Sequence, residues 1–153
     1  MDSIDKKILK ILSKDASVSA SEISNQINLS IPAVNKRILK MKKDKIIRNF
    51  TVITDEKKVE KPIIAFIFLV LQYGDGVEKL LQHIQKDEDI LECYAVTGEY
   101  DYLIKACAKD VRTLEDKLLE LKKKKGVIKS HTMLSLMEHK FSPTILPDEE
   151  MPL

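Results

Sequence analysis

Two short helices with well-defined beginnings and ends are predicted within residues 19–48. Ser19 and Glu22 have the spacing of a capping box, in which the hydroxyl accepts from an amide of the first turn and the carboxylate accepts from the cap's own amide. The helix that they start should end at Asn28, because asparagine tolerates the left-handed backbone that a tight turn requires. Ser30 then caps the next helix. This arrangement predicts a helix-turn-helix.

The second of these helices, called the recognition helix below, has an apolar face and a basic face. Val34, Ile38 and Met41 recur at helical spacing and define a buried stripe, and polar and basic residues lie opposite. A solvated lysine-rich surface is the alternative, but two capped helices joined by a tight turn favour a helix that enters the DNA major groove with its N-terminal end first. We therefore expect double-stranded DNA as a partner, with Ser30, Pro32, Ala33, Asn35 and Lys36 near base edges and Arg37 and Lys40 nearer phosphates.

A further helix, capped by Asp2 and extending to about Lys14, precedes the helix-turn-helix. We expect the recognition helix to continue to Arg48 and the residues Phe50–Ile53 to form a short strand or wing. The charged stretch before Pro62 indicates a domain boundary. The predicted divisions are residues 1–54 for DNA binding, 55–61 as a linker, 62–140 as a second domain and 141–153 as a mobile tail.

Charge is distributed unevenly between these parts. Residues 1–55 hold 11 lysines and arginines against 6 aspartates and glutamates, whereas residues 56–153 hold 15 against 18. A basic first part joined to an acidic second part indicates a polyanion-binding module attached to a domain with another role.

Cysteine usage and hydropathy indicate a cytoplasmic protein without a metal or cofactor. Cys93 and Cys107 do not have the spacing of a metal site, and no signal peptide is recognisable, so we expect reduced thiols buried in strands. The longest apolar run, Ile63–Leu71, is too short to span a bilayer, and no membrane partner is expected.

The pattern after Pro62 predicts an α+β domain. Its elements are a strand at 62–72, a helix around 77–84, strands at 90–96 and 102–108, a helix from the cap Asp110 to Gly126, and a strand at 127–137. The order β-α-β-β-α-β is that of a ferredoxin-like fold with both helices on one sheet face. Both faces of the first strand are apolar, so we expect at least a homodimer.

From Asp2 to about Lys140 the chain resembles the Lrp/AsnC family of transcriptional regulators, the feast/famine proteins. The resemblance is carried by IDKKILKIL, SASEISNQINLS, VNKRILKMKKDKIIRNF and, most specifically, ECYAVTGEYDYLIKACAKD. It implies an N-terminal DNA-binding domain, a βαββαβ regulatory domain that dimerises sheet to sheet, assembly into tetramers or octamers, and small effectors, usually amino acids. By position, the effector pocket would involve Thr97, Gly98, Glu99, Tyr100, Asp101, Ser130 and Thr132.

The chain departs from the family pattern at two turns. Asn28 and Lys45 stand where family members often have glycine. Asparagine can adopt the left-handed backbone, whereas lysine adopts it less readily, so the geometry after the recognition helix is where this chain would differ.

The turn predicted at residues 97–101 offers groups that suit the two charged ends of an amino acid. Amides near Gly98 and the hydroxyls of Thr97 or Thr132 can donate to a carboxylate, and Glu99 or Asp101 can accept from an ammonium. These residues also have ordinary structural interpretations. Glycine is common in turns, and the hydroxyl of a threonine in a strand is often hydrogen-bonded within the protein.

Two other functions remain open. Relatives with this architecture include sirohaem decarboxylases, but a multiply carboxylated tetrapyrrole calls for arginines and a well-placed histidine, and the second domain has only Arg112 and one interior candidate, His131. A DNA-architectural protein would differ from a regulator only in its lack of response to amino acids.

Overall fold

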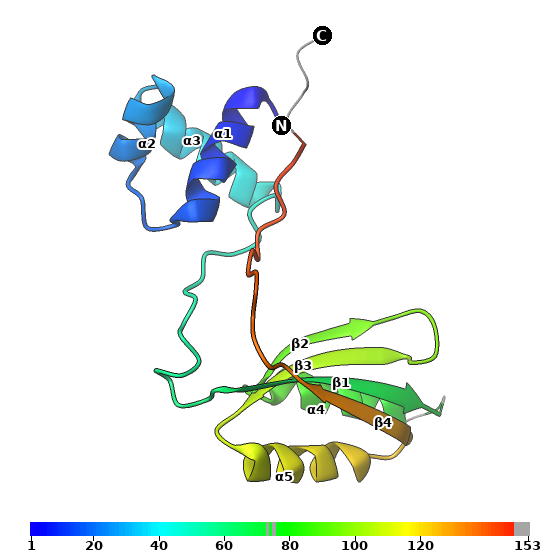
Figure 1. Ribbon diagram of the computed structural model, residues 1–153. Coiled ribbons are helices and arrows are strands. Elements are labelled where there is room, and N and C mark those ends of the chain that lie inside the picture. The colour runs from blue at the N-terminus through cyan, green and yellow to red at the C-terminus, as the bar shows by residue number, and fades with distance from the viewer. Residues whose placement is uncertain (73, 75, 149–153) are drawn as a thin grey trace. The chain divides into compact units, whose positions relative to one another are not determined.

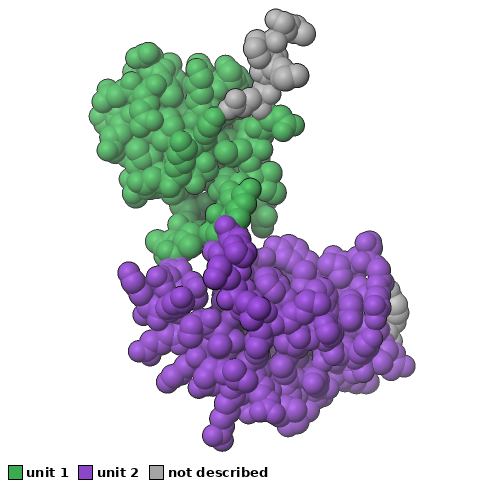
Figure 2. All heavy atoms as spheres, in the orientation of Figure 1, with its two compact units in different colours: residues 1–53, 140–153 green, residues 54–139 purple. Residues whose placement is uncertain are grey.

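The computed structural model describes residues 1–72, 74 and 76–148. Asp75, in the expected glycine-rich turn, and the tail acids Glu149 and Glu150 lie outside the described residues. The chain forms two compact units, one made of residues 1–53 with the residues from 140 onwards, and one made of residues 54–139 (Figure 2). Each unit has its own hydrophobic core.

The first unit contains three helices, α1 (Ser3–Lys14), α2 (Ala20–Ile27) and α3 (Ile31–Lys43) (Figure 1). All three begin at side-chain caps, and Asp2 forms a capping box with Asp5 at the start of α1. The apolar faces of the three helices pack against one another in a small core, because a single helix cannot bury its own apolar face. The buried core residues are Ile8, Ile23, Val34 and Met41.

The recognition helix α3 ends at Lys43, so the prediction that it continues to Arg48 was wrong. Lys45 has a φ of 56°, in the left-handed region. The amide of Lys45 donates to the carbonyl of Lys42 at 3.0 Å, and that of Ile46 donates to the carbonyl of Met41 at 2.9 Å. These two bonds form a Schellman motif, which satisfies the last carbonyls and stops the helix.

The residues Phe50–Ile53, predicted as a strand or wing, contain neither helix nor strand. A strand needs a neighbour for its backbone groups, and this described segment pairs with no strand of its own chain. Its apolar side chains are exposed, with Val52 at 83%.

The second unit has the predicted βαββαβ order. Its elements are β1 (Ile63–Leu71), α4 (Gly76–Lys86), β2 (Ile90–Ala95), β3 (Tyr102–Ala108), α5 (Val111–Lys122) and β4 (Val127–Leu134). The strands form an antiparallel sheet in the order β2-β3-β1-β4, and both helices lie on the same sheet face (Figure 1). This is the ferredoxin-like arrangement expected from the sequence.

The last strand ends at Leu134 rather than at Met137 as predicted. Leu134 pairs with Ala65, and the amide of Ser135 donates to the carbonyl of Ile64 at 2.8 Å. Because β1 begins at Ile63, later residues of the chain have no partner strand to extend the ladder.

The two faces of β1 differ in burial. Ala65, Ile67 and Leu69 point to the helices and are fully buried, whereas the alternate residues, among them Phe66 and Phe68, point to the open face and are only half-buried. The sheet therefore has one covered apolar face and one uncovered apolar face.

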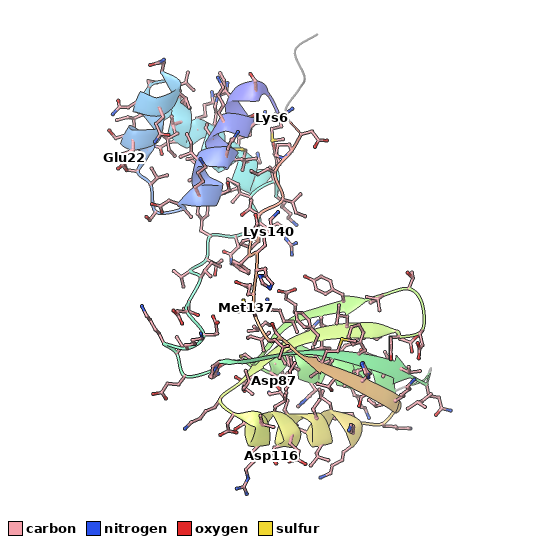
Figure 3. The ribbon with its side chains drawn as sticks, viewed as in Figure 1. Lys6, Glu22, Asp87, Asp116, Met137 and Lys140 are labelled. Carbon is pink, nitrogen blue, oxygen red and sulfur yellow. The ribbon has the colours of Figure 1, made fainter. Side chains whose placement is uncertain are left out.

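The segments at the boundaries of the units form hydrogen bonds of their own. The linker 55–61 forms a helical turn, in which the amide of Lys61 donates to the carbonyl of Glu56 at 2.8 Å. In the tail, the ammonium of Lys6, which lies on α1 (Figure 3), donates to the carbonyl of Asp148 at 3.0 Å, and the mobility expected of the tail stays a prediction.

Candidate functional site

The helix-turn-helix is built on side-chain caps. The hydroxyl of Ser19 accepts from the amide of Glu22 at 3.2 Å, and the carboxylate of Glu22 accepts from the amide of Ser19 at 2.8 Å. The Ser19 hydroxyl also donates to that carboxylate at 2.7 Å, and this bond first and the Ser19 amide second hold the pKa of Glu22 below its ordinary value. Asn28 then takes the left-handed backbone, with a φ of 53°, and redirects the chain toward α3.

The helix α3 presents a polar and basic face to solvent. Ser30 caps it by accepting from the amide of Ala33 at 3.4 Å, and Pro32 lies in the first turn, where a missing amide costs no helical bond. Val34 and Met41 anchor the opposite face in the core. Most of the predicted DNA contacts lie on the exposed side, namely Ser30, Pro32, Asn35, Lys36 and Lys40, and Ala33 is half-buried beside them.

The ammonium groups of Lys36 and Lys40 are available to an external anion. Both side chains are exposed, and within the described part of the chain neither forms an ion pair. The two residues are one helical turn apart, so their side chains lie on the same side of α3. This spacing suits contact with a DNA backbone.

Arg37 has partners within the chain that the sequence did not suggest. It was expected nearer phosphates, but its guanidinium is half-buried and contacts α1, where one nitrogen donates to Asp2 at 2.7 Å and to Asp5 at 2.8 Å. Arg37 follows the buried Val34 by three positions, which places it at the edge of the apolar stripe rather than opposite it.

The hairpin turn between β2 and β3 contains five of the seven predicted effector residues, those at 97–101. Gly98 has a φ of 114°, which a residue with a Cβ would rarely adopt, and the amide of Val96 donates to the carbonyl of Asp101 at 2.9 Å to close the turn. Thr97, Gly98 and Glu99 are exposed. Their backbone and side-chain groups are accessible to a ligand at the tip of the hairpin.

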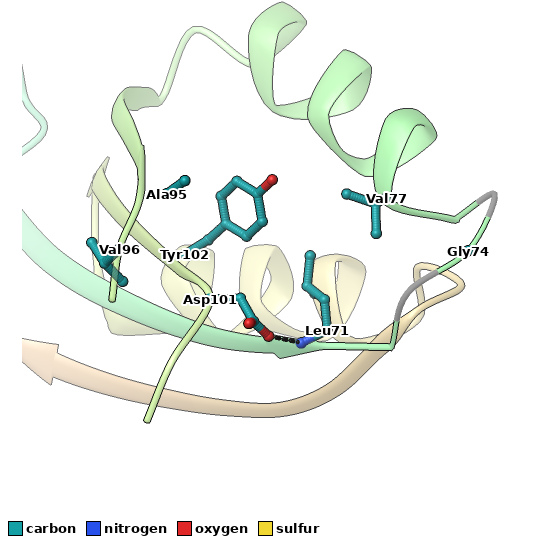
Figure 4. A pocket seen from close by; sticks show the side chains of 7 residues that line it. All are labelled: Leu71, Gly74, Val77, Ala95, Val96, Asp101 and Tyr102. Atoms are coloured by element: carbon teal, nitrogen blue, oxygen red, sulfur yellow. Dashed lines mark hydrogen bonds between the residues drawn. The ribbon is translucent and has the colours of Figure 1, made fainter. Parts of the chain in front are cut away.

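A cavity of about 300 Å³ lies at the base of this turn, on the helix-covered side of the sheet (Figure 4). Asp101 contributes its carboxylate, and its Oδ2 accepts from the backbone amide of Leu71 at 2.7 Å. The other lining side chains are mainly apolar, with the phenol of Tyr102 as the second polar group. The lining residues are Leu71, Gly74, Val77, Ala95, Val96, Asp101 and Tyr102.

The structure does not bring all the predicted effector residues together. Asp101 alone of them lines the cavity. Tyr100 packs on the open sheet face, with its ring centroid 5.1 Å from that of Phe68. Ser130 and Thr132 pair with Leu69 and Ile67 and therefore share the helix-covered face.

Glu99 already has a partner in the chain. Its carboxylate pairs with the ammonium of Lys129 at 3.0 Å, and this pairing raises the pKa of Lys129. The ammonium also lies 5.5 Å from the ring of Tyr100. A ligand ammonium would have to compete with Lys129 for Glu99, whereas among the described residues the carboxylate of Asp101 accepts only from the amide of Leu71.

The apolar residues of the cavity were not singled out from the sequence. Leu71, Val77 and Tyr102 fit the repeat patterns of ordinary core positions, and only the pairing of three strands with the start of α4 places them around one space. The sequence likewise did not indicate that Gly76 lies at a close backbone contact. A Cβ there would lie 2.1 Å from the carbonyl oxygen of Lys125, so glycine lets α4 begin against that turn.

The two cysteines lie in strands, as predicted, but only one is fully buried. Cys107 is buried and Cys93 is half-buried, and burial is the main cause that raises the pKa of both thiols. Among the described residues no group of three or more histidine, cysteine, aspartate or glutamate side chains could hold a metal ion. No helix of the described chain is long and apolar enough to cross a membrane.

Sequence comparisons match both units to known domains. The Lrp/AsnC ligand binding domain matches residues 64–145, and a winged helix-turn-helix DNA-binding domain matches residues 1–48. The HTH-type transcriptional regulator FL11 of Pyrococcus abyssi is 34% identical over 140 residues, which cover 92% of each chain. The leucine-responsive regulatory protein of Escherichia coli is 30% identical over 148 residues, which cover 93% of this chain and 88% of that protein.

A solved structure has a very similar fold over most of the chain. It is the crystal structure of a transcriptional regulator from Neisseria meningitidis in complex with L-Met, which superposes with a TM-score of 0.91 at 26% identity and covers 95% of this chain and 96% of that one.

Proposed function

The chain belongs to the Lrp/AsnC family of transcriptional regulators, and on this premise we propose that it binds specific DNA sequences through α3 and that an amino acid alters its DNA affinity or its assembly. Regulation would act through binding alone, without an enzymatic activity. The observation that carries the DNA-binding part is the exposed face of α3, where Asn35, Lys36 and Lys40 stand free of partners in the described chain.

The residues of this face would have different tasks. Asn35, in the first half of α3, can form paired hydrogen bonds with an adenine edge, which is worth about 1–3 kcal/mol of discrimination. Lys36 and Lys40 would neutralise phosphates, and each phosphate contact makes affinity more dependent on salt.

The experiment is an anisotropy titration with a duplex that the full-length protein has selected from a random pool. Lys36→Ala should weaken binding to all sequences and lower the salt slope by about 1 for each recognition helix engaged. Asn35→Ala should instead reduce the preference for the selected duplex over a scrambled one. Unchanged titrations for both variants would remove α3 from the groove.

The proposed effector site is the hairpin turn and the cavity at its base. The Oδ1 atom of Asp101 has no hydrogen-bond partner in the described chain, so it can accept from a ligand ammonium. The apolar lining suits a hydrophobic side chain, and the amides of the turn can donate to a carboxylate. Because the chain's own Ser130 and Thr132 lie away from this cavity, a neighbouring subunit would complete the site.

Assembly is part of the proposal. The open sheet face exposes apolar side chains of β1 and β4, including Met133 at 51% exposure. Pairing two such faces would remove this surface from water, and a homodimer would present two recognition helices to successive DNA half-sites. Further assembly into tetramers or octamers would bring hairpin turns of neighbouring dimers together.

A further inference from the structure

Arg37 joins the recognition helix to the first turn of α1. Its Nη1 atom donates both to Oδ2 of Asp2, at 2.7 Å, and to Oδ1 of Asp5, at 2.8 Å. Asp5 is only 9% exposed and is the buried charged side chain of the described part of the protein. A buried carboxylate needs a cation or several donors, and Arg37 supplies the cation.

The two carboxylates divide their oxygens between Arg37 and the backbone of α1. Oδ1 of Asp2 accepts from the amides of Ile4 and Asp5, at 3.0 and 2.9 Å, and Oδ2 of Asp5 accepts from the amide of Asp2 at 3.2 Å. The remaining oxygen of each carboxylate bonds to Arg37. The amide of Asp5 first and Arg37 second hold the pKa of Asp2 below its ordinary value.

Backbone amides hold both carboxylates independently of Arg37. The capping box orients the two side chains so that the remaining oxygen of each is within hydrogen-bond distance of the guanidinium. Apolar contacts of Val34 and Met41 hold α3 against the core but are not directional. Charge-assisted hydrogen bonds are directional, so the Arg37 contacts restrict rotation of α3 about its own axis.

The position of Arg37 connects this restraint to the DNA-binding face. Arg37 follows Asn35 by two residues and Lys36 by one, in the half of α3 that would enter the groove. A rotation of the helix would move both neighbours relative to the bases and phosphates. The orientation of Asn35 therefore depends on contacts that lie on the far side of the helix.

We propose that Arg37 is a positioning residue that fixes the recognition helix through Asp2 and Asp5, and that it does not contact DNA phosphates. This inference rests on the proposed DNA-binding function of α3. It predicts that acidic residues of α1, which are not expected to touch DNA, influence sequence discrimination as strongly as Arg37 does.

The test compares full-length variants on the duplex selected from a random pool and on its scrambled version. Arg37→Gln and Asp5→Asn should each reduce the ratio of the two affinities by about tenfold, which corresponds to about 1.4 kcal/mol of discrimination. The double variant should lose no more than either single variant, because both changes break one network. The salt slope should remain that of the parent in all three.

Three controls separate positioning from other roles. Lys36→Gln should lower the salt slope by about 1 for each recognition helix engaged, which shows that the assay detects a phosphate contact. Asp116→Asn makes the same chemical change on the exposed surface of α5 and should alter neither quantity. Thermal unfolding of each variant sets a titration temperature at which all remain folded.

Each outcome decides the inference. A lower salt slope for Arg37→Gln, with Asp5→Asn indistinguishable from the parent, would identify Arg37 as a phosphate contact and overturn the positioning role. Unchanged discrimination in folded Arg37→Gln and Asp5→Asn would also overturn it. If Lys36→Gln leaves the salt slope unchanged and Asn35→Ala leaves the preference for the selected duplex unchanged, the proposed function of α3 fails instead, and the two failures are distinguishable.

Discussion

The carboxylate of Asp101 accepts a hydrogen bond from the backbone amide of Leu71 at 2.7 Å, which ties the hairpin turn to the last residue of β1. The backbone amide of Asp101 donates to the carbonyl of Leu69 at 2.9 Å, so the same residue contacts β1 twice. A ligand that engages this carboxylate would therefore act on the end of the central strand and on the turn together.

Two substitutions at Asp101 should separate its structural role from its binding role. Asp101→Ala leaves the amide of Leu71 without its acceptor and should lower the free energy of unfolding by about 1–3 kcal/mol. Asp101→Asn keeps an acceptor oxygen but loses the charge that an ammonium needs. It should retain most of the stability and lose the response of DNA binding to the amino acid.

Denaturant unfolding and DNA titration with the amino acid measure these two properties. DNA affinity without ligand should remain close to that of the parent for Asp101→Asn. A normal amino-acid response in Asp101→Asn would show that the effector binds elsewhere.

The open sheet face should hold the dimer together. Phe66 is half-buried on this face and lies between Lys105 on β3 and Met133 on β4. Phe66→Glu would place a charge in the apolar interface, and the full-length variant should have a lower mass by light scattering at micromolar concentration. Val111→Glu, an equivalent change at a 61% exposed position at the start of α5, should keep the parent's mass. A monomeric parent would contradict the interface.

Lys45 is a site where glycine should stabilise the protein. Its left-handed backbone, with a φ of 56°, costs a residue with a Cβ about 1–2 kcal/mol that glycine does not pay. Lys45→Gly should therefore raise the thermal midpoint of the first unit. Lys7→Gly, in the interior of α1, should lower the stability by about 1 kcal/mol and is the matched control. A lower midpoint for Lys45→Gly would indicate that the lysine side chain contributes contacts that outweigh the strain.

The cap of α5 should make stability depend on pH in the acid range. Asp110 accepts from the amide of Thr113 at 2.7 Å and from its hydroxyl at 2.8 Å, and these bonds, the amide first, lower the pKa of Asp110. Because the folded-state pKa lies below the unfolded value of 3.8, the stabilisation is complete above that value and is lost as the pH falls through the folded pKa.

Asp110→Asn tests this linkage, since asparagine also caps helices but does not titrate in this range. Between about pH 5 and pH 3 the unfolding free energy of the parent should fall more steeply than that of the variant. Parallel pH profiles in denaturant titrations would show that the cap contributes nothing to the pH dependence.

Local signals predicted most of the fold. The caps at Ser19, Ser30 and Asp110 form as expected, because each accepts from an amide three residues further along the chain. The alternation in residues 63–71 predicted a central strand with two apolar faces. The order of the elements along the chain then predicted the ferredoxin-like topology, in which both helices cover one face of the sheet.

The predictions failed where the structure of a segment depends on contacts with residues distant in the sequence rather than on its own residue pattern. The basic run to Arg48 suggested a longer helix, although Lys45 stands where family members often have glycine, and the left-handed backbone that Lys45 adopts ends α3 at Lys43. Residues 50–53 have strand-like composition, but strands form only where a neighbour pairs with them. Sequence spacing likewise could not show that Arg37 contacts α1, because the acceptors are more than thirty residues away in the chain.

The cavity of the proposed effector site could not be predicted from the sequence. The hairpin turn at residues 97–101 was correctly located, but the cavity at its base depends on which faces of β1 and β3 point toward α4. The positions of Ser130 and Thr132 relative to the turn are set by the register of β4 on β1, which a single sequence does not specify.

The most direct test of the account is the DNA affinity of the full-length protein with and without amino acids. The protein is titrated into a labelled duplex that it has selected from a random pool, in the presence of each common amino acid in turn, with a scrambled duplex alongside. We predict a preference for the selected duplex and a change in its affinity, or in the mass of the complex, with at least one amino acid, since a ligand must bind one state better than another to regulate. Equal binding to both duplexes, or titrations and masses that no amino acid alters, would contradict it.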